Sequence, residues 1–249
     1  MSRPPIPAPG SGPGSGPGRP VPWHQVLTPH HLAPHSLPPD SLLPSRGAVP
    51  AQAPARPPRP RLPAADLLDG VGRWGVMDTP VGQFRLHPVR LPRDLSLVAG
   101  WMNDPVVAAF WELSGPAELT EQHISTQLDG DGRSAPCLGL LDGTPMSYWE
   151  LYRADLDPIA RHYPARPHDT GVHLLLGPPE CRGRGVGPRL LRAVAERALR
   201  ERHSAARVVA EPDVRNIPSV RAFLKAGFRH HQDLDLPAKR AALMVRDRV

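Results

Sequence analysis

The first 66 residues most restrict what this chain can fold into, because they hold 19 of its 35 prolines and no sustained apolar periodicity. Runs such as residues 4–9 and the Ser-Gly-Pro-Gly repeat of residues 11–18 lack backbone donors and favour coil or polyproline II. Such sequence buries too little apolar surface to offset the entropy lost on ordering. We therefore predict a disordered tail over residues 1–66 and one folded domain over residues 73–249.

The positive charge of the chain is concentrated in this tail. The formal net charge is +6 with histidine neutral, and the tail carries six arginines against Asp40 and Asp66. This leaves 30 − 6 = 24 basic and 24 − 2 = 22 acidic residues for the remainder, without a basic stripe interleaved with aromatics. We expect no binding to nucleic acid.

Cysteine usage and apolar runs indicate the compartment. Cys137 and Cys181 have no CxxC spacing, which predicts neither zinc nor a disulfide framework and favours a reducing environment. The chain begins without the apolar stretch of a signal peptide, and no apolar run reaches membrane-spanning length. We expect a cytoplasmic protein. The four histidines within residues 24–35 lie in proline-rich sequence without a scaffold, so we predict no metal site.

Strand and helix patterns alternate from residue 81 onward. A short strand is expected near residues 84–89, followed by helices over residues 92–102, 105–112 and 118–128. Asp142-Gly143 predicts a tight hairpin between two strands, because Asp-Gly supplies the positive φ that such a turn needs.

The second half of the domain has clearer signals. We predict strands over residues 171–177 and 207–210, an amphipathic helix with Pro188 suited to its first position, and a helix over residues 217–226. Asn216 is expected to cap the last helix and Gly227 to end it. The total predicts an α/β fold with a mixed, mostly antiparallel sheet flanked by helices.

A glycine-rich segment between the strand over residues 171–177 and the amphipathic helix suits a pyrophosphate. Its glycines let the backbone approach closely, the helix N-terminus presents N–H groups, and Arg182 and Arg184 supply positive charge. The segment is Arg182, Gly183, Arg184, Gly185, Val186 and Gly187. The plain alternative is an ordinary glycine-rich turn.

Two other phosphate motifs fit the segment less well. A P-loop would end in Gly-Lys-Ser/Thr, which this segment lacks. A dinucleotide-binding turn would use Glu211 for the ribose, but the glycine spacing is GxGxG and residues 178–180 separate it from the strand. We rank the dinucleotide interpretation a distant second.

The same segment resembles the acyl-CoA pyrophosphate loop of GNAT acyltransferases, and Asn216-x-x-Ser219-x-x-Ala222-Phe223 resembles their following helix. Segments at residues 101–105, 110–111, 148–150, 171–173 and 211–216 resemble, in this order, the siderophore-biosynthesis branch of the family. That branch acetylates hydroxylysine in aerobactin synthesis and acylates lysine in mycobactin synthesis. The similarity spans about residues 73–249.

The resemblance implies a GNAT fold with an acyl-CoA bound by the glycine-rich segment and Asn216. It implies that His173 takes a proton from an attacking nitrogen. It also implies that backbone N–H groups near Leu174, Leu175 and Leu176 stabilise the oxyanion. A histidine on a strand is otherwise more often a hydrogen-bonded core residue.

Four further residues are predicted to act on the acceptor. Asp213 would orient His173 or bind the cationic end of the substrate, although a turn or helix-capping aspartate explains it equally simply. Trp111 and Trp149 would supply planar walls for an alkyl chain, and Glu150 a carboxylate for an ammonium; the alternative for these three is the core.

One position departs from the family pattern. Many GNAT enzymes have a tyrosine on the helix after Asn216 to protonate the departing thiolate, whereas this chain has Phe223 there. The general acid is therefore unassigned, and solvent can serve because a thiolate is a tolerable leaving group.

These predictions give an acyl-CoA-dependent N-acyltransferase that acts on the terminal amine or hydroxylamine of a lysine-, ornithine- or cadaverine-like acceptor. We expect direct attack, because no cysteine or serine lies in an activated arrangement. One alternative is a GNAT enzyme of another branch, acting on an antibiotic amine or a protein N-terminus. The other is an interaction protein whose proline-rich tail binds partners.

Overall fold

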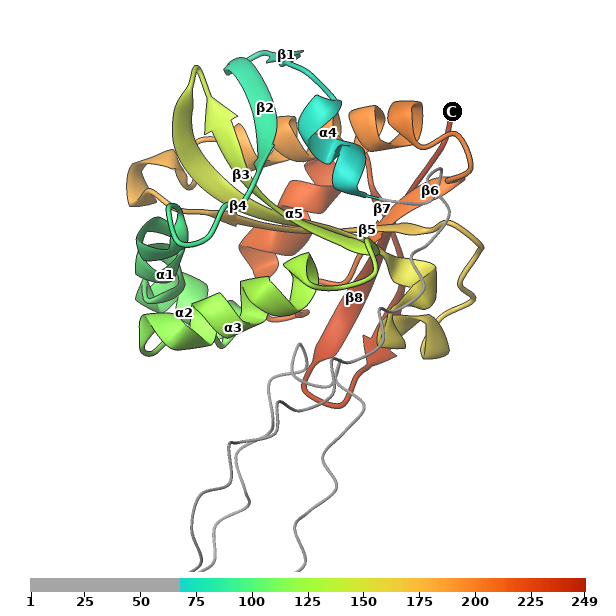
Figure 1. The fold of residues 1–249 in the computed structure, drawn as a ribbon. Coiled ribbons are helices and arrows are strands. Elements are labelled where there is room, and N and C mark those ends of the chain that lie inside the picture. The colour runs from blue at the N-terminus through green and yellow to red at the C-terminus, as the bar shows by residue number, and fades with distance from the viewer. Residues whose placement is uncertain (1–67) are drawn as a thin grey trace, which may run out of the picture.

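One eight-stranded sheet organises residues 68–249, which are the residues described by this computed structural model (Figure 1). The strand order is β1-β2-β3-β4-β5-β6-β8-β7, and all neighbours are antiparallel except β5 and β6. The strands are β1 (Met77–Thr79), β2 (Gly82–Pro88), β3 (Ser134–Leu141), β4 (Thr144–Arg153), β5 (Thr170–Leu176), β6 (Arg207–Ala210), β7 (Arg229–Asp235) and β8 (Arg240–Asp247). This confirms the predicted mixed, mostly antiparallel sheet. The predicted tail and its histidines lie outside the described residues.

Five α-helices cover the two faces of this sheet in residues 68–249. They are α1 (Leu95–Met102), α2 (Pro105–Trp111), α3 (Ala117–Leu128), α4 (Val186–Glu201) and α5 (Ile217–Lys225). Helices α1, α2 and α3 gather on the face that carries Leu138, Tyr148 and Leu175 (Figure 1). Helices α4 and α5 pack on the opposite face, which carries Trp149 and Val172.

Several local predictions are confirmed at the level of single residues. Asp142 and Gly143 have φ values of 49° and 81°, as a tight hairpin requires, and join β3 to β4. Asn216 accepts a hydrogen bond from the Ser219 backbone N–H at 3.2 Å and caps α5. The helix predicted over residues 92–102 begins only at Leu95, because the Asp94 carboxylate folds back onto the Arg90 N–H at 2.8 Å.

The ordered core begins before residue 73. A 3₁₀-helix, η3 (Asp69–Arg73), is flanked by Leu68 and Trp74, and both pack in the same cluster as β2, α4 and Val71. Leu68 and Val71 are each 1% exposed. Composition alone puts the domain boundary slightly too late, because two apolar residues in a short turn carry no periodic signal.

The parallel pair β5 and β6 is paired only at its base. Thr170 faces Val208 and Gly171 faces Val209, whereas β5 remains paired with β4 along its whole length. The two strands therefore part after Gly171, and the edge of β5 over residues 172–176 has no ladder to β6. A protein backbone that leaves a ladder this way can receive a ligand along the open edge.

A buried ion pair fixes the base of this opening. Asp169, just before β5, accepts two hydrogen bonds from Arg207, the first residue of β6, both at 2.8 Å. The side chains are 0% and 3% exposed, and Tyr163 donates its hydroxyl to the same carboxylate at 3.0 Å. The start of both strands is thus held by a fully satisfied charge pair.

Candidate active site

His173 lies on β5 two residues beyond the point where β5 and β6 part. Its register partner on β4 is Glu150, so both side chains share one face of the sheet. The Nδ1 atom is 3.0 Å from Glu150 Oε2, and Nε2 is 2.5 Å from Glu211 Oε1. Glu211 directly follows β6, so these side chains bridge the two strands where their backbones separate.

The two carboxylates keep His173 protonated. Carboxylate oxygens only accept hydrogen bonds, so both ring nitrogens of His173 act as donors. Burial alone lowers the pKa of an imidazole, but the charges of Glu211 and Glu150 outweigh it and raise the pKa of His173 to about 10. The family resemblance implies that His173 takes a proton from the attacking nitrogen, and this role stays a prediction; a charged ring between two carboxylates donates to both of them.

The Glu150 carboxylate is hydrogen-bonded to four side chains of the protein. Its Oε1 accepts hydrogen bonds from His123 Nε2, from Gln127 Nε2 at 2.7 Å and from the Tyr148 hydroxyl at 2.9 Å. With His173 on Oε2, the carboxylate has four donors, three of them on Oε1 and one on Oε2. Burial raises its pKa, but the two histidines outweigh burial and hold the pKa well below the ordinary value. Glu150 therefore holds His173 directly, and its predicted contact with a substrate ammonium stays a prediction.

Glu211 joins the candidate site through His173, although the sequence suggested it only as a ribose-binding acid of the less favoured dinucleotide fold. Its side chain is 0% exposed, its Oε2 accepts the Tyr152 hydroxyl at 2.8 Å, and Lys239 Nζ lies 3.9 Å from Oε1. Burial raises its pKa, but His173 and Lys239 outweigh this and lower it to about 2. A carboxylate at the end of a buried strand was the available signal, yet the sequence did not show which strand lies beside β6.

The protonation of His173 has a measurable consequence. We expect its ring to stay charged through neutral pH, as followed by NMR of the imidazole in a pH titration. A raised pKa favours the folded state fully below 6.5, and this contribution is lost as the pH rises through about 10. The variant Glu211→Gln removes one anion and should lower the pKa of His173.

The matched control for this titration is Asp233→Asn, which removes a carboxylate 2.9 Å from the exposed His230. It should leave the His173 titration unchanged. A wild-type His173 that titrates near 6.5 would contradict the assignment.

The two predicted tryptophans lie on opposite faces of the sheet. Trp111 meets His173 edge-on at a ring separation of 6.1 Å, and Tyr152 packs on the other side at 4.9 Å. Trp149 is 0% exposed and donates its Nε1–H to Ser147 Oγ at 2.8 Å. Successive strand residues alternate between faces, so Trp149 points away from its neighbour Glu150. Trp111 and Tyr152 are the aromatic side chains beside His173, and Trp149 belongs to the core.

Asp213 has its carboxylate paired with Arg215, two residues along the chain. Its carboxylate accepts the Arg215 backbone N–H at 2.7 Å and pairs with Arg215 Nη2 at 2.6 Å. Its backbone carbonyl accepts the Asn216 N–H at 2.9 Å, and its chain forms a bridge to Ala241. The carboxylates that orient His173 are Glu150 and Glu211, and a catalytic role for Asp213 remains a prediction.

Arg182 anchors the loop after β5. Its guanidinium donates to the carbonyls of Leu176 at 2.9 Å and Gly177 at 2.5 Å, and to Asp104 Oδ1 at 2.9 Å. Asp104 also caps α2. Arg182 therefore ties the end of β5 to α2 with its charge compensated, whereas Arg184 is exposed.

The start of α4 presents free backbone donors beside a basic pocket. Gly185 has a φ of 74° and precedes α4, whose N-terminus has no side-chain cap. A pocket of about 430 Å³ adjoins Gly185 and is also lined by Arg189, Arg192 and Lys225. The three predicted leucines follow the alternation of β5, with Leu175 buried under α1–α3 and Leu174 and Leu176 partly buried on the other face.

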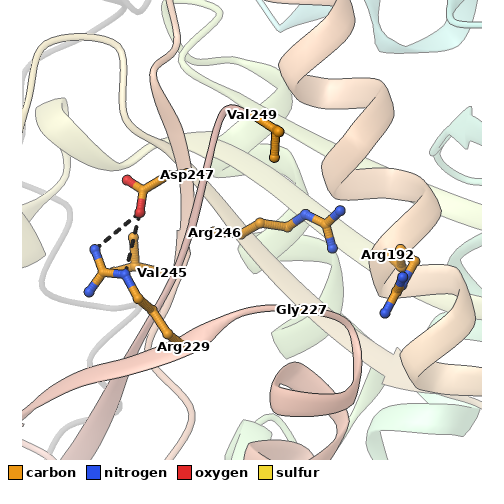
Figure 2. Close-up of a pocket in the computed structure, with 7 residues that line it drawn as sticks. All are labelled: Arg192, Gly227, Arg229, Val245, Arg246, Asp247 and Val249. Atoms are coloured by element: carbon orange, nitrogen blue, oxygen red, sulfur yellow. Dashed lines mark hydrogen bonds and ion pairs between the residues drawn. The ribbon is translucent and has the colours of Figure 1, made fainter.

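A second pocket lies where β7 and β8 meet α4 (Figure 2). It measures about 250 Å³ and shares no lining residue with the His173 cluster. Arg229 pairs with Asp247 at 3.1 Å, and Arg246 extends toward Arg192 on α4 while pairing with Glu196 at 2.5 Å (Figure 2). The first pair joins β7 to β8, and the second ties β8 to α4.

Within residues 68–249, no group of three or more His, Cys, Asp or Glu side chains is arranged to hold a metal ion. None of the helices in this part of the chain is long and apolar enough to cross a membrane. Cys137 is buried and Cys181 is half-buried, and both are free thiols.

The acetyltransferase (GNAT) domain model matches residues 90–236. The chain belongs to the GNAT acetyltransferase family. It is 35% identical over 192 residues to the lysine N-acyltransferase MbtK of Mycolicibacterium paratuberculosis, covering 76% of this chain and 85% of that protein. It is also 35% identical over 196 residues to the N(6)-hydroxylysine O-acetyltransferase of Escherichia coli, covering 78% of this chain and 59% of the relative.

Solved GNAT structures share the fold. A crystal structure of an uncharacterized Bacillus halodurans protein is 33% identical with a TM-score of 0.65, covering 70% of this chain and 89% of its own. The aminoglycoside acetyltransferase AAC(6')-Ib, solved with coenzyme A, is 22% identical with a TM-score of 0.56, covering 66% and 95%. The GNAT enzyme is thus an acyltransferase whose fold neighbours include proteins solved with coenzyme A.

Proposed function

We propose that this GNAT enzyme transfers an acyl group from an acyl-CoA to the terminal nitrogen of a lysine-, ornithine- or cadaverine-like acceptor in hydroxamate siderophore biosynthesis. The observation that carries this proposal is the His173 imidazolium, clamped by two buried carboxylates at the opening between β5 and β6 and flanked by Trp111 and Tyr152. Relatives named for lysine and N(6)-hydroxylysine acylation support the acceptor class.

The acyl-CoA would lie along the open edge of β5 with its phosphates at the start of α4. The uncapped N–H groups after Gly185 suit the pyrophosphate, and the cations of the adjoining pocket suit further phosphate charge. Backbone N–H groups near Leu174, Leu175 and Leu176 would face the thioester oxygen. The side-chain oxygen of Asn216 caps α5 by accepting the Ser219 N–H. Asn216 would therefore contribute to CoA binding indirectly, by fixing where α5 begins.

The chemistry would proceed by direct attack of the acceptor nitrogen on the thioester carbonyl. The C–N bond forms, the C–S bond breaks, and the nitrogen loses one proton. Once bonded to the carbonyl carbon, that nitrogen is strongly acidic, so the coupled Glu211–His173 pair can accept its proton despite the low pKa of Glu211. Phe223 is buried against Phe228 and has no proton to give, so the departing thiolate would take one from water.

Turnover by the full chain tests this assignment. Acetyl-, succinyl- and long-chain acyl-CoA would each be combined with hydroxylated and unmodified lysine, ornithine and cadaverine, and both CoA release and the N-acyl product would be measured. We expect product with at least one of these acceptors. Product with aminoglycosides or peptides alone would instead place the enzyme in another branch of the family.

A glycine substitution tests the CoA site. At Gly185 the φ of 74° disfavours any side chain, and a Cβ atom would lie 2.8 Å from Arg189 Nη1. We expect Gly185→Ala to weaken acyl-CoA binding about tenfold, because closer approach of the phosphates to the backbone is lost. Calorimetric Kd values measure this effect.

The control for Gly185→Ala is Gly143→Ala in the β3–β4 turn. Gly143 has a φ of 81° and open space where a Cβ atom would lie, so the substitution carries a similar backbone strain of about 1 kcal/mol far from the loop. Its acyl-CoA Kd should equal that of the wild type. Equal weakening in both variants would show that strain, not the phosphate site, sets the affinity.

A further inference from the structure

Lys239 reaches into the acceptor site from the turn between β7 and β8. Its Nζ atom lies 3.9 Å from Glu211 Oε1, and its side chain is 19% exposed above a carboxylate that is 0% exposed. The turn is closed by the Leu236 N–H, which donates to Lys239 O at 2.9 Å, and the start of β8 is tied to the segment after β6 because the Val214 N–H donates to Arg240 O at 3.0 Å. The side chain of Lys239 thus lies beside Glu211 from a hydrogen-bonded turn.

The oxygen that Lys239 faces already has a second cation. Glu211 Oε1 lies between Lys239 Nζ and His173 Nε2, and Oε2 is used by Tyr152. A distance of 3.9 Å is within ion-pair range but too long for a hydrogen bond, so Lys239 acts on this oxygen through its charge. An alkylammonium acceptor brought to this carboxylate would be a third cation and would be repelled by Lys239.

We propose that Lys239 makes the site selective for an acceptor whose terminal nitrogen is uncharged, as in a hydroxylamine, over an alkylammonium. This inference rests on the proposed function. An unmodified lysine side chain has an ordinary pKa of about 10.4 and is charged at neutral pH. A hydroxylamine nitrogen is less basic, so more of it is neutral and lies beside Lys239 without repulsion.

Proton transfer favours the same acceptor. Interaction with His173 and Lys239 outweighs burial and lowers the pKa of Glu211 to about 2, so Glu211 is too weak a base to take a proton from an alkylammonium before attack. A nitrogen that arrives neutral needs no such step.

The test compares lysine with N6-hydroxylysine, which differ only at the reacting nitrogen, in the wild type, Lys239→Met and Lys239→Arg. At saturating acyl-CoA, Lys239→Met should lower KM for lysine about tenfold and change KM for N6-hydroxylysine by less than about twofold. Lys239→Arg keeps the charge and should keep the wild-type preference.

The matched control is Arg240→Met, which removes the neighbouring cation of the same turn. Arg240 is 63% exposed and pairs with Asp233 at 3.1 Å, away from Glu211. Its preference between the two acceptors should equal that of the wild type.

An unchanged preference in Lys239→Met, or a lost preference in Lys239→Arg, would overturn the proposal. If the wild type acylates none of the lysine, ornithine and cadaverine acceptors, the proposed function fails; if it acylates only ornithine or cadaverine acceptors, the same comparison is made with that amine and its hydroxylamine. The calorimetric Kd values of the two compounds then still report whether Lys239 discriminates between them. A Lys239→Met protein that does not fold would be replaced by Lys239→Gln, judged by the same ratio.

Discussion

Replacing His173 by glutamine should lower kcat/KM by about 10²–10⁴-fold for the preferred acceptor. The variant removes the cation that joins Glu150 to Glu211 and with it the path for the proton of the acceptor nitrogen. Glutamine keeps much of the side-chain volume and can donate only in one direction. Steady-state kinetics with saturating acyl-CoA measure the loss.

Stability must be separated from catalysis in this variant. Without His173, Glu150 and Glu211 lose their shared counter-charge although their side chains are only 8% and 0% exposed, so the melting temperature should also fall. Assays well below that temperature isolate the chemical effect. His230→Gln, at a 47% exposed histidine, is the control and should keep full activity. Full activity in the His173 variant would refute a catalytic role for this side chain.

Asp169→Asn should lower the free energy of unfolding by about 3–5 kcal/mol. The substitution leaves Arg207 as a buried cation whose side chain is 3% exposed, and it replaces one acceptor oxygen by an amide that only donates. The Tyr163 hydroxyl and the Arg166 N–H both use this carboxylate oxygen atom, Oδ2. Urea unfolding followed by circular dichroism measures the change.

The exposed pair between Arg229 and Asp247 provides the comparison. Its side chains are 51% and 43% exposed and the closest atoms are 3.1 Å apart, so Asp247→Asn should cost about 0–1 kcal/mol. Equal losses in the two variants would mean that burial does not decide the strength of these ion pairs. That result would also mean that the Asp169–Arg207 ion pair does not hold the parallel strands β5 and β6 together.

Features that depend on a few consecutive residues could be predicted from the sequence. The Asp142-Gly143 turn, the Asn216 cap and the glycine loop before α4 each follow from the conformation that one residue type allows. The apolar face of α4 follows from helical spacing, and its residues are buried as predicted: Leu190, Leu191, Val194, Ala195, Ala198 and Leu199.

Features that depend on which strands are neighbours in the sheet could not be predicted from the sequence. The sequence predicted both Trp149 and Glu150 at the acceptor site, although neighbours on a strand face opposite ways; most of β4 is buried on both faces, so the pattern could not show which face carries the site. Glu211 and His173 are 38 residues apart, and only the parallel pairing of β5 with β6 brings them together. His123 reaches Glu150 from a helix, a contact that no local motif indicates.

The opening between β5 and β6 has a paired base and an unpaired end. The base contributes to stability, and the unpaired end carries the candidate site. The Asp169–Arg207 pair secures the strands where they start, whereas the proposed acceptor site is formed by residues beyond Gly171 and after β6. Substitutions at Trp111 or Lys239 therefore change the unpaired end and leave the Asp169–Arg207 ion pair intact. Substitutions at the unpaired end of β5 and β6 can therefore change which amine is accepted while the fold stays intact.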